Sequence, residues 1–192
     1  METVPKFDPS QAVTFDLAFG HVHLDSAPNR VMIPADQLVK LCNAAGEAAT
    51  VALAVDMGHA MGKRSALRIA QGAADRLSVV RGVPFEQVIE HLAAEFALVG
   101  LGTFGAERWG KGLVLVHDQS PLGTAGDMLI ARVLEAAIAA LSGATAHVVR
   151  LEHDGVRARF LVVSGEVAER VRARLGAGEH WGSIVASLHK RA

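Results

Sequence analysis

The sequence predicts an α+β fold, and three observations carry this prediction. Two segments, about 101–118 and 147–163, alternate apolar and polar residues around a turn signal, which is typical of β-hairpins. The segment between them, about 124–143, repeats apolar residues at steps of three and four, which is typical of an amphipathic helix. Helical patterns precede and follow these segments. We therefore expect helices, hairpin, helix, hairpin and C-terminal helices in a single domain, 1–192.

The N-terminal part, 1–29, is predicted to be a strand extension. Every second residue of 13–19 is apolar, which predicts a strand that bends at Gly20 and continues through 21–23. A partner strand is expected at 30–33.

Three helices are predicted next. The first begins after Pro34 and ends at Gly46, because proline suits the first position of a helix and glycine suits its end. The second is expected over 47–77, and the third runs from Pro84 to about Val99.

Two glycines inside the second helix indicate a close approach. Gly58 and Gly62 lie one turn apart on the same side, and each costs about 1 kcal/mol relative to alanine in a helix interior. Either another backbone or a flat ligand is expected to come close there.

The first hairpin spans about 101–108 and 113–118. In its most direct register, both faces are partly apolar. One face carries Phe104, Ala106, Leu113 and Leu115, and the other carries Trp109, Val114 and Val116. We expect helices to cover the first face and a second subunit to cover the other.

The second hairpin turns at Asp154–Gly155, a dipeptide that suits a two-residue type I′ turn. This turn pairs Val149 with Phe160 and Arg150 with Arg159. Alternation then gives an apolar face of Val149, Leu151, Ala158, Phe160 and Val162, and a charged face of Arg150, Glu152, Arg157 and Arg159. We interpret the charged face as solvated, with Glu152 paired to Arg157. The alternative is an anion-binding patch formed by Arg150, Arg157 and Arg159.

The last predicted elements are helical. Ser164 is expected to cap a helix that reaches about Leu175, and a short helix follows around Trp181. We therefore divide the domain into the N-terminal extension, a core over 30–163 and a C-terminal helical extension over 164–192.

The composition bounds the function. Of the 192 residues, 51% are hydrophobic, which is ample to bury a core. The net charge of −1, the lack of tyrosine and the presence of only two tryptophans argue against nucleic-acid binding. The single cysteine, Cys42, excludes an intrachain disulfide and a multi-cysteine metal site. No apolar run is long enough to span a bilayer and residues 1–10 carry no apolar targeting stretch, so we expect a cytoplasmic protein.

The segment 30–163 resembles the 4-vinyl-reductase domain family. The likeness is carried by Arg30–Pro34, by Gly58 and Gly62, by Gly100–Gly102 and by the closing hairpin over 148–162. Relatives of this family include the sensor domains of aromatic-responsive transcription activators and vesicle-tethering transport-particle subunits of eukaryotes.

The resemblance implies a helical layer against a four-stranded antiparallel sheet, frequent homodimerisation, and a cavity between helices and sheet for a hydrophobic or aromatic molecule. It does not imply catalysis. Members of the family often hold a metal with cysteines in the last hairpin. The corresponding positions here are Arg150 and Ala158, so the usual metal site is not expected.

The candidate ligand-binding residues lie on the second and third helices and the first hairpin. They are Met57, Gly58, His59, Met61, Gly62, Phe96, Phe104 and Trp109. His59 is placed to contact a planar ligand or a haem iron, although a helix-surface histidine is the favoured interpretation. His21 and His23 share a strand face and are candidate metal ligands only if a third ligand joins them. His117–Ser120 contains the residue types of a catalytic triad, but consecutive residues cannot form one unaided, and no catalytic residue is assigned.

Three functions remain open, and no cofactor is identified. The leading one is a non-catalytic sensor or carrier that holds a hydrophobic or aromatic molecule between helices and sheet. The alternative is a dimeric protein-interaction module with a filled core and an exposed apolar patch around Trp109. The third is a haem- or metal-dependent enzyme that uses His59, or the His21 and His23 pair. We expect a homodimer, with a small molecule or another protein as partner.

Overall fold

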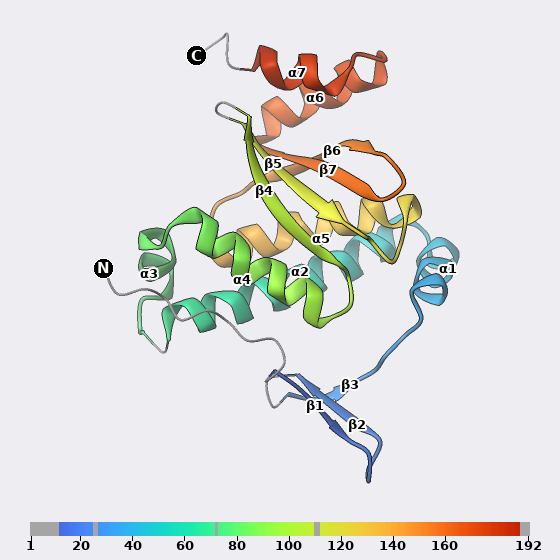
Figure 1. Cartoon of the computed structure of the whole chain (residues 1–192), viewed down its shortest axis with the longest axis vertical. Coiled ribbons are helices and arrows are strands. Elements are labelled where there is room, and N and C mark those ends of the chain that lie inside the picture. The colour runs from blue at the N-terminus through green and yellow to red at the C-terminus, as the bar shows by residue number, and fades with distance from the viewer. Residues whose placement is uncertain (1–11, 25–26, 72, 110–111, 189–192) are drawn as a thin grey trace.

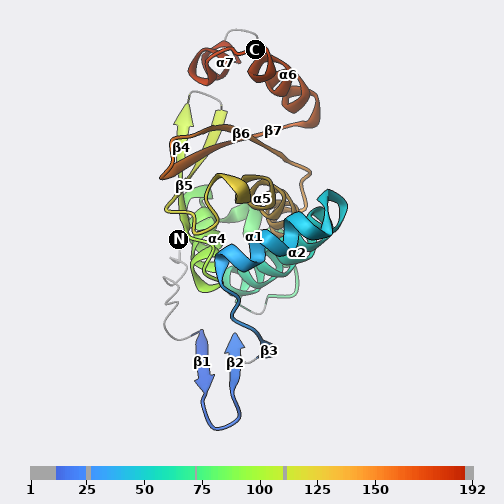
Figure 2. The same ribbon diagram turned by 90° about the vertical axis from the view of Figure 1, so that its right-hand side faces the viewer.

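A four-stranded antiparallel sheet lies between two sets of helices (Figure 1). The computed structural model describes residues 12–24, 27–71, 73–109 and 112–188. The larger set of helices covers one face of the sheet, the two C-terminal helices cover the other, and a small three-stranded arm projects from the helical side (Figures 1 and 2). This arrangement confirms the predicted α+β class and the helical layer on a four-stranded sheet.

The larger helical layer follows the predicted order with one correction. Its elements are α1 (Ala35–Ala45), α2 (Glu47–Ala70), α3 (Arg76–Gly82), α4 (Phe85–Leu98), the 3-10 turn η2 (Thr124–Gly126) and α5 (Asp127–Ser142). The single helix predicted over 47–77 is wrong. Gln71 has a left-handed backbone (φ 46°) that ends α2, and the Asp75 carboxylate accepts the backbone N–H of Ser78 to begin α3.

The glycines of α2 allow a close helix crossing. A Cβ atom at Gly58 would lie 2.7 Å from the Cβ of Ala136 and closer still to the carbonyl oxygen of Val133. A Cβ atom at Gly62 would meet the carbonyl oxygen of Ala137 in the same way. Of the two options that the sequence leaves open, the structure therefore has another backbone, that of α5, against these glycines.

The sheet has the order β4-β5-β7-β6. Its strands are β4 (Thr103–Trp109), β5 (Gly112–Asp118), β6 (His147–His153) and β7 (Arg157–Val163). The register of the first hairpin is as predicted, with Ala106 opposite Leu115. Phe104 and Leu115 face the helical layer and join a core with Phe96 and Phe160.

The predicted register of the second hairpin is wrong. Asp154 accepts the backbone N–H groups of Val156 and Arg157 with its side chain, and its own N–H donates to the carbonyl of Arg157. The turn therefore centres one residue later, and a bulge at Leu151 shifts the register again. Arg150 consequently lies opposite Phe160.

The far face of the sheet is covered by the chain itself. Val114, Val116 and Leu161 are buried with Val149 and Leu151 beneath α6 (Gly165–Gly176) and α7 (Trp181–Ser187). The second subunit expected on this face is therefore replaced by the C-terminal helices. Val149 and Leu151 lie on this side, and not with Phe160 as predicted.

The N-terminal extension forms a three-stranded antiparallel arm and not one bent strand. Its strands are β1 (Val13–Asp16), β2 (His21–Leu24) and β3 (Ala27–Arg30). The Asp16 carboxylate accepts the N–H groups of Ala18 and Phe19, and Gly20 has a φ of 68°, so the chain reverses where a bend is expected. Across the described ranges, no helix has the length and apolar character needed to cross a bilayer.

Candidate functional site

The predicted ligand-binding residues do not gather around one space. Met61, Phe96 and Phe104 are buried in the main core, and Met57 packs against it. The rings of Phe96 and Phe104 meet edge to face at 5.0 Å. These side chains fill the interior between helices and sheet.

His59 and Trp109 lie elsewhere. His59 is exposed on α2, whereas Gly58 and Gly62 face α5. Trp109 is 40% exposed at the end of β4, and its ring contacts that of Trp181 on α7 at 5.1 Å. His59 therefore lies away from the buried side chains of Met57 and Met61, and Trp109 lies away from Phe104.

The candidate metal ligands are two neighbouring histidines with no third ligand among the described residues. His21 and His23 contact each other on the arm, with ring centroids 5.9 Å apart. In the described ranges, no group of three His, Cys, Asp or Glu side chains is arranged to hold a metal ion.

Each arginine of the predicted anion patch has a carboxylate partner. Arg150 pairs with Asp127, Arg157 with Asp118 and Arg159 with Glu152, at 3.1, 2.6 and 3.0 Å. The predicted Glu152–Arg157 pair is thus replaced. Arg150 points towards the helical layer, while Arg159 lies over the ring of Trp181 on the other side of the sheet. The three arginines do not share a face.

An apolar hollow of about 200 Å³ lies beneath α1, between the start of α2 and the segment that leads into α5. Its apolar side chains are Leu38, Val39, Cys42, Leu122, Met128 and Leu129, and its polar side chains are Asn43, Glu47 and Thr50. The Thr50 hydroxyl is buried and lies 2.9 Å from the carbonyl oxygen of Gly46 and 3.0 Å from that of Cys42, which share its single donated proton. Its oxygen keeps the capacity to accept a hydrogen bond.

Helix α1 packs on the core mainly through side chains that also line this hollow. Of its residues 35–45, all of which the structure describes, none is fully buried. The side chains that pack against the core include Leu38, Val39 and Cys42, which also line the hollow. A molecule in the hollow would therefore complete the packing of α1.

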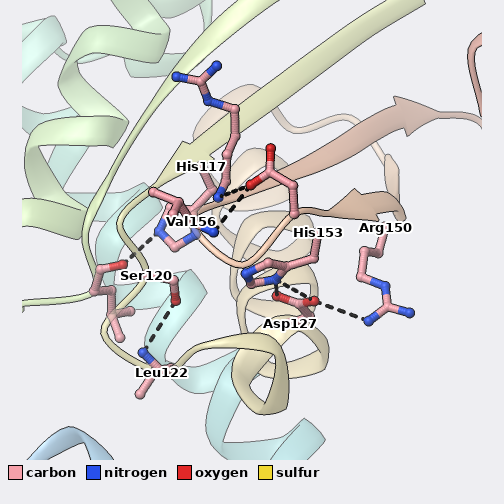
Figure 3. A network of polar contacts seen from close by, with 10 residues as sticks. His117, Ser120, Leu122, Asp127, Arg150, His153 and Val156 are labelled. Atoms are coloured by element: carbon pink, nitrogen blue, oxygen red, sulfur yellow. Dashed lines mark hydrogen bonds and ion pairs between the residues drawn. The ribbon is translucent and has the colours of Figure 1, made fainter.

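A buried polar cluster lies on the other side of the same segment. The Asp127 carboxylate, in the first turn of α5, is within 2.9–3.0 Å of His153 Nδ1 and 3.1 Å of Arg150 Nη1 (Figure 3). The side chains of Asp127 and His153 are almost completely buried. The N-terminus of a helix favours a carboxylate, which adds to the stabilisation. The cluster ties the β6–β7 hairpin to α5.

His117 extends this cluster across the sheet. It lies opposite Ala158, which lies opposite His153, so the two imidazoles flank Ala158 on one face. His117 Nε2 donates to the carbonyl oxygen of Leu101 at 2.7 Å, and burial lowers the pKa of His117, so the ring is neutral at pH 7. A glycine at 102 makes room for the ring, because a Cβ there would lie 2.9 Å from Nε2.

The other nitrogen of His117 lacks a partner. Within the described residues, Nδ1 is buried and makes no hydrogen bond, which leaves a bare acceptor near the rings of Phe96 and Phe160. In the sequence, His117 stands out only as part of the possible triad His117–Ser120. His117 follows Leu113 and Leu115 at every second position of β5, and this alternation is the signal that places it on the core face.

The hollow and the polar cluster share one structural element. Gly126 and Met128 line the hollow, while Asp127 between them contacts His153 and Arg150. A shift of this turn of α5 would therefore move both.

The fold is shared with a known sensory domain. A solved structure similar to this chain is that of the phenol-responsive sensory domain of the transcription activator PoxR with phenol. The TM-score is 0.55 and the sequence identity 16%, over 87% of this chain and 92% of that one. No protein-family model and no curated protein matches the sequence. At this identity the likeness establishes the fold.

Proposed function

We propose that this chain is a small-molecule sensory module that binds a single-ring hydrophobic or aromatic compound in the hollow beneath α1. The observation that carries the proposal is the hollow itself, with its size and its apolar wall. The phenol-responsive domain with the same fold supports the ligand class. We further propose that the chain is a cytoplasmic, non-catalytic relative of the 4-vinyl-reductase domains, as the sequence resemblance implies.

The size of the hollow selects the ligand. An apolar cavity of about 150 Å³ in another protein binds benzene, so a space of about 200 Å³ suits one ring with a small substituent. Larger cofactors such as haem do not fit this volume. The buried Thr50 oxygen offers an acceptor for a ring hydroxyl, while the aliphatic wall takes the ring.

The response follows from the position of α1. A ring in the hollow contacts Leu38, Val39 and Cys42 on one side and Met128 on the other. Binding would therefore stabilise docked α1 and press on the turn that carries Asp127. The signal is a shift in the population of docked α1, relayed to the β6–β7 hairpin through the Asp127–His153 contact.

The alternative function, a protein-interaction module, would need a different surface from the one predicted around Trp109. It requires exposed apolar side chains around Trp109, but Val114 and Val116 are buried beneath the C-terminal helices. The large exposed apolar surface lies instead on the N-terminal arm.

A ligand-shift experiment with phenol tests the proposed function. Phenol should raise the Tm of the full chain in a concentration-dependent way, because a ligand that binds only the folded state stabilises it by about 2.7 kcal/mol at 100 times its Kd. Toluene, which lacks the hydroxyl, should raise the Tm less than phenol if the Thr50 oxygen accepts from the ligand.

Two matched variants locate the site. Cys42→Phe places a ring in the hollow and should abolish the phenol-dependent shift. Leu41→Phe adds a ring to the adjacent, exposed position of α1 and should keep the shift. If the shift persists in folded Cys42→Phe, the hollow is not the site. If neither phenol nor toluene changes the Tm of the native chain, the proposed function fails.

A further inference from the structure

A second, larger hollow lies on the side of the sheet that the C-terminal helices cover. We call it the C-terminal groove; it is bounded by α6, the end of α7, the start of β5 and the end of β7. Figures 1 and 2 show these helices on the opposite side of the sheet from α2 and α5. The volume of the groove is about 510 Å³, which is within the range of about 300–1,000 Å³ that is usual for small-molecule sites.

The floor of the C-terminal groove is apolar and aliphatic. Val171 of α6 is fully buried, and the partly buried Val163, Val167 and Leu188 pack against the same core on this face of the sheet. Among the described residues that line the groove, none is aromatic. Such a floor suits a hydrocarbon chain, and each CH₂ group that it buries should lower the Kd by about fourfold.

The charged side chains along the groove are arginines. Arg170 and Arg174 lie four residues apart on α6, so they project from the same side of the helix. No aspartate or glutamate belongs to the lining within the part of the chain that the structure describes. The wall of the groove therefore favours an anion over a cation.

The two arginines differ in how they are held. The Arg174 guanidinium donates to both carboxylate oxygens of Glu179, with Nε 2.7 Å from Oε2, and to the hydroxyl of Ser187, so it joins α6 to α7. Arg170 has one loose contact in the described ranges, with Nη1 3.8 Å from the Glu166 carboxylate, and its side chain is 53% exposed. Its planar set of N–H donors can therefore bind a carboxylate through two parallel hydrogen bonds.

We propose that the C-terminal groove binds an aliphatic carboxylate of about eight to twelve carbon atoms, with its chain on the valines and its carboxylate on Arg170. Charge complementarity and the aliphatic floor select this class. A neutral chain leaves the donors of Arg170 unused, and a single-ring acid leaves most of the volume empty. The inference does not depend on the hollow beneath α1, which has other lining residues.

Calorimetric titration of the full chain with decanoate, below its micelle concentration, tests the proposal. Decanoate should bind with one molecule per chain, and octanoate, which has two fewer CH₂ groups, should bind about 15-fold more weakly. Decyltrimethylammonium has the same chain with the opposite charge, and it should bind more weakly than decanoate.

Matched variants locate the site. Val167→Phe places a ring in the groove and should abolish binding of decanoate, whereas Ala173→Phe, at an exposed position of the same helix, should keep it. Arg170→Gln should raise the Kd about fivefold, because an exposed charge pair is lost. Arg108→Gln removes another exposed arginine with one carboxylate partner, outside the groove, and should leave the Kd unchanged.

The outcomes separate this site from the one beneath α1. Decanoate should bind equally well to Cys42→Phe, in which a ring occupies the other hollow. The proposal is overturned if decanoate does not bind the native chain, or if folded Val167→Phe binds it as tightly as Ala173→Phe does. It is also overturned if decyltrimethylammonium matches decanoate, or if Arg170→Gln and Arg108→Gln have equal effects. Should Val167→Phe fail to fold, the arginine pair alone decides.

Discussion

Replacing Gly58 by alanine perturbs the close crossing of α2 and α5. The added Cβ would lie 2.7 Å from the Cβ of Ala136 and closer still to the carbonyl oxygen of Val133, both on α5. Ordinary contact between carbon atoms begins near 3.5 Å, so α2 and α5 must separate locally by about 1 Å. The obstacle includes backbone, which cannot rotate away as a side chain can.

Two opposing effects set the magnitude. Overpacking a core costs about 1–3 kcal/mol, and a clash with backbone belongs at the upper end. Alanine also has a helix propensity about 1 kcal/mol better than that of glycine. The free energy of unfolding should therefore fall by about 2 kcal/mol, the steric cost being larger than the gain in propensity.

Urea unfolding followed by circular dichroism measures this change. Gly176→Ala is the matched control, because Gly176 ends α6 and a Cβ there meets nothing within 4 Å. The control should be neutral or slightly stabilising. If Gly58→Ala is as stable as the native chain or more stable, α2 and α5 do not cross this closely, and the reason given for the glycine is refuted.

Three further predictions follow from the site. Asp127→Asn should lower the free energy of unfolding by about 2 kcal/mol, because a buried charged acceptor is lost. Asp118→Asn, which removes a partly exposed ion pair, should lower it by less than about 1 kcal/mol. Equal losses for the two variants in urea titrations would contradict this. Burial lowers the pKa of His117, so below about pH 6.5 the unfolded chain binds a proton that the folded chain does not, and stability falls as the pH falls. This pH dependence should weaken in His117→Asn, with His91 supplying a remaining part of the same sign; an unchanged pH profile would count against it. Phenol should slow amide hydrogen exchange in α1 (35–45), and unchanged exchange there at saturating phenol would contradict the proposed docking.

The first hairpin shows what local pattern can predict. Alternation of apolar residues predicts the faces of 101–118, and the structure has Phe104, Ala106 and Leu115 on one face as expected. The second hairpin shows where pattern is insufficient. The dipeptide Asp154–Gly155 suits a turn in two positions, and the Asp154 side chain selects the later one by accepting two backbone N–H groups. Moving the turn by one residue changes each pairing by two residues and keeps the faces, whereas the bulge at Leu151 changes the register by one residue and exchanges them, so Val149 and Leu151 lie outside the core to which they were assigned.

The candidate site depends on contacts between distant segments. The hollow joins α1, the start of α2 and the residues before α5, and no motif in any of these segments marks a ligand. The residues predicted around Gly58 pack into the core because α5 occupies the space that a ligand would need. Sequence spacing indicates that something comes close to Gly58 and Gly62, but it does not say what.

The sequence by itself determined the class of the fold, the order of its elements and the need for a close approach at Gly58 and Gly62, because periodicity, turn residues and glycines act within a few residues of the chain. Only the tertiary structure decided which helices cover each face of the sheet, where the hollow lies and which charges meet. Those features arise from packing between segments far apart in sequence, such as Asp127 against His153 and α5 against α2.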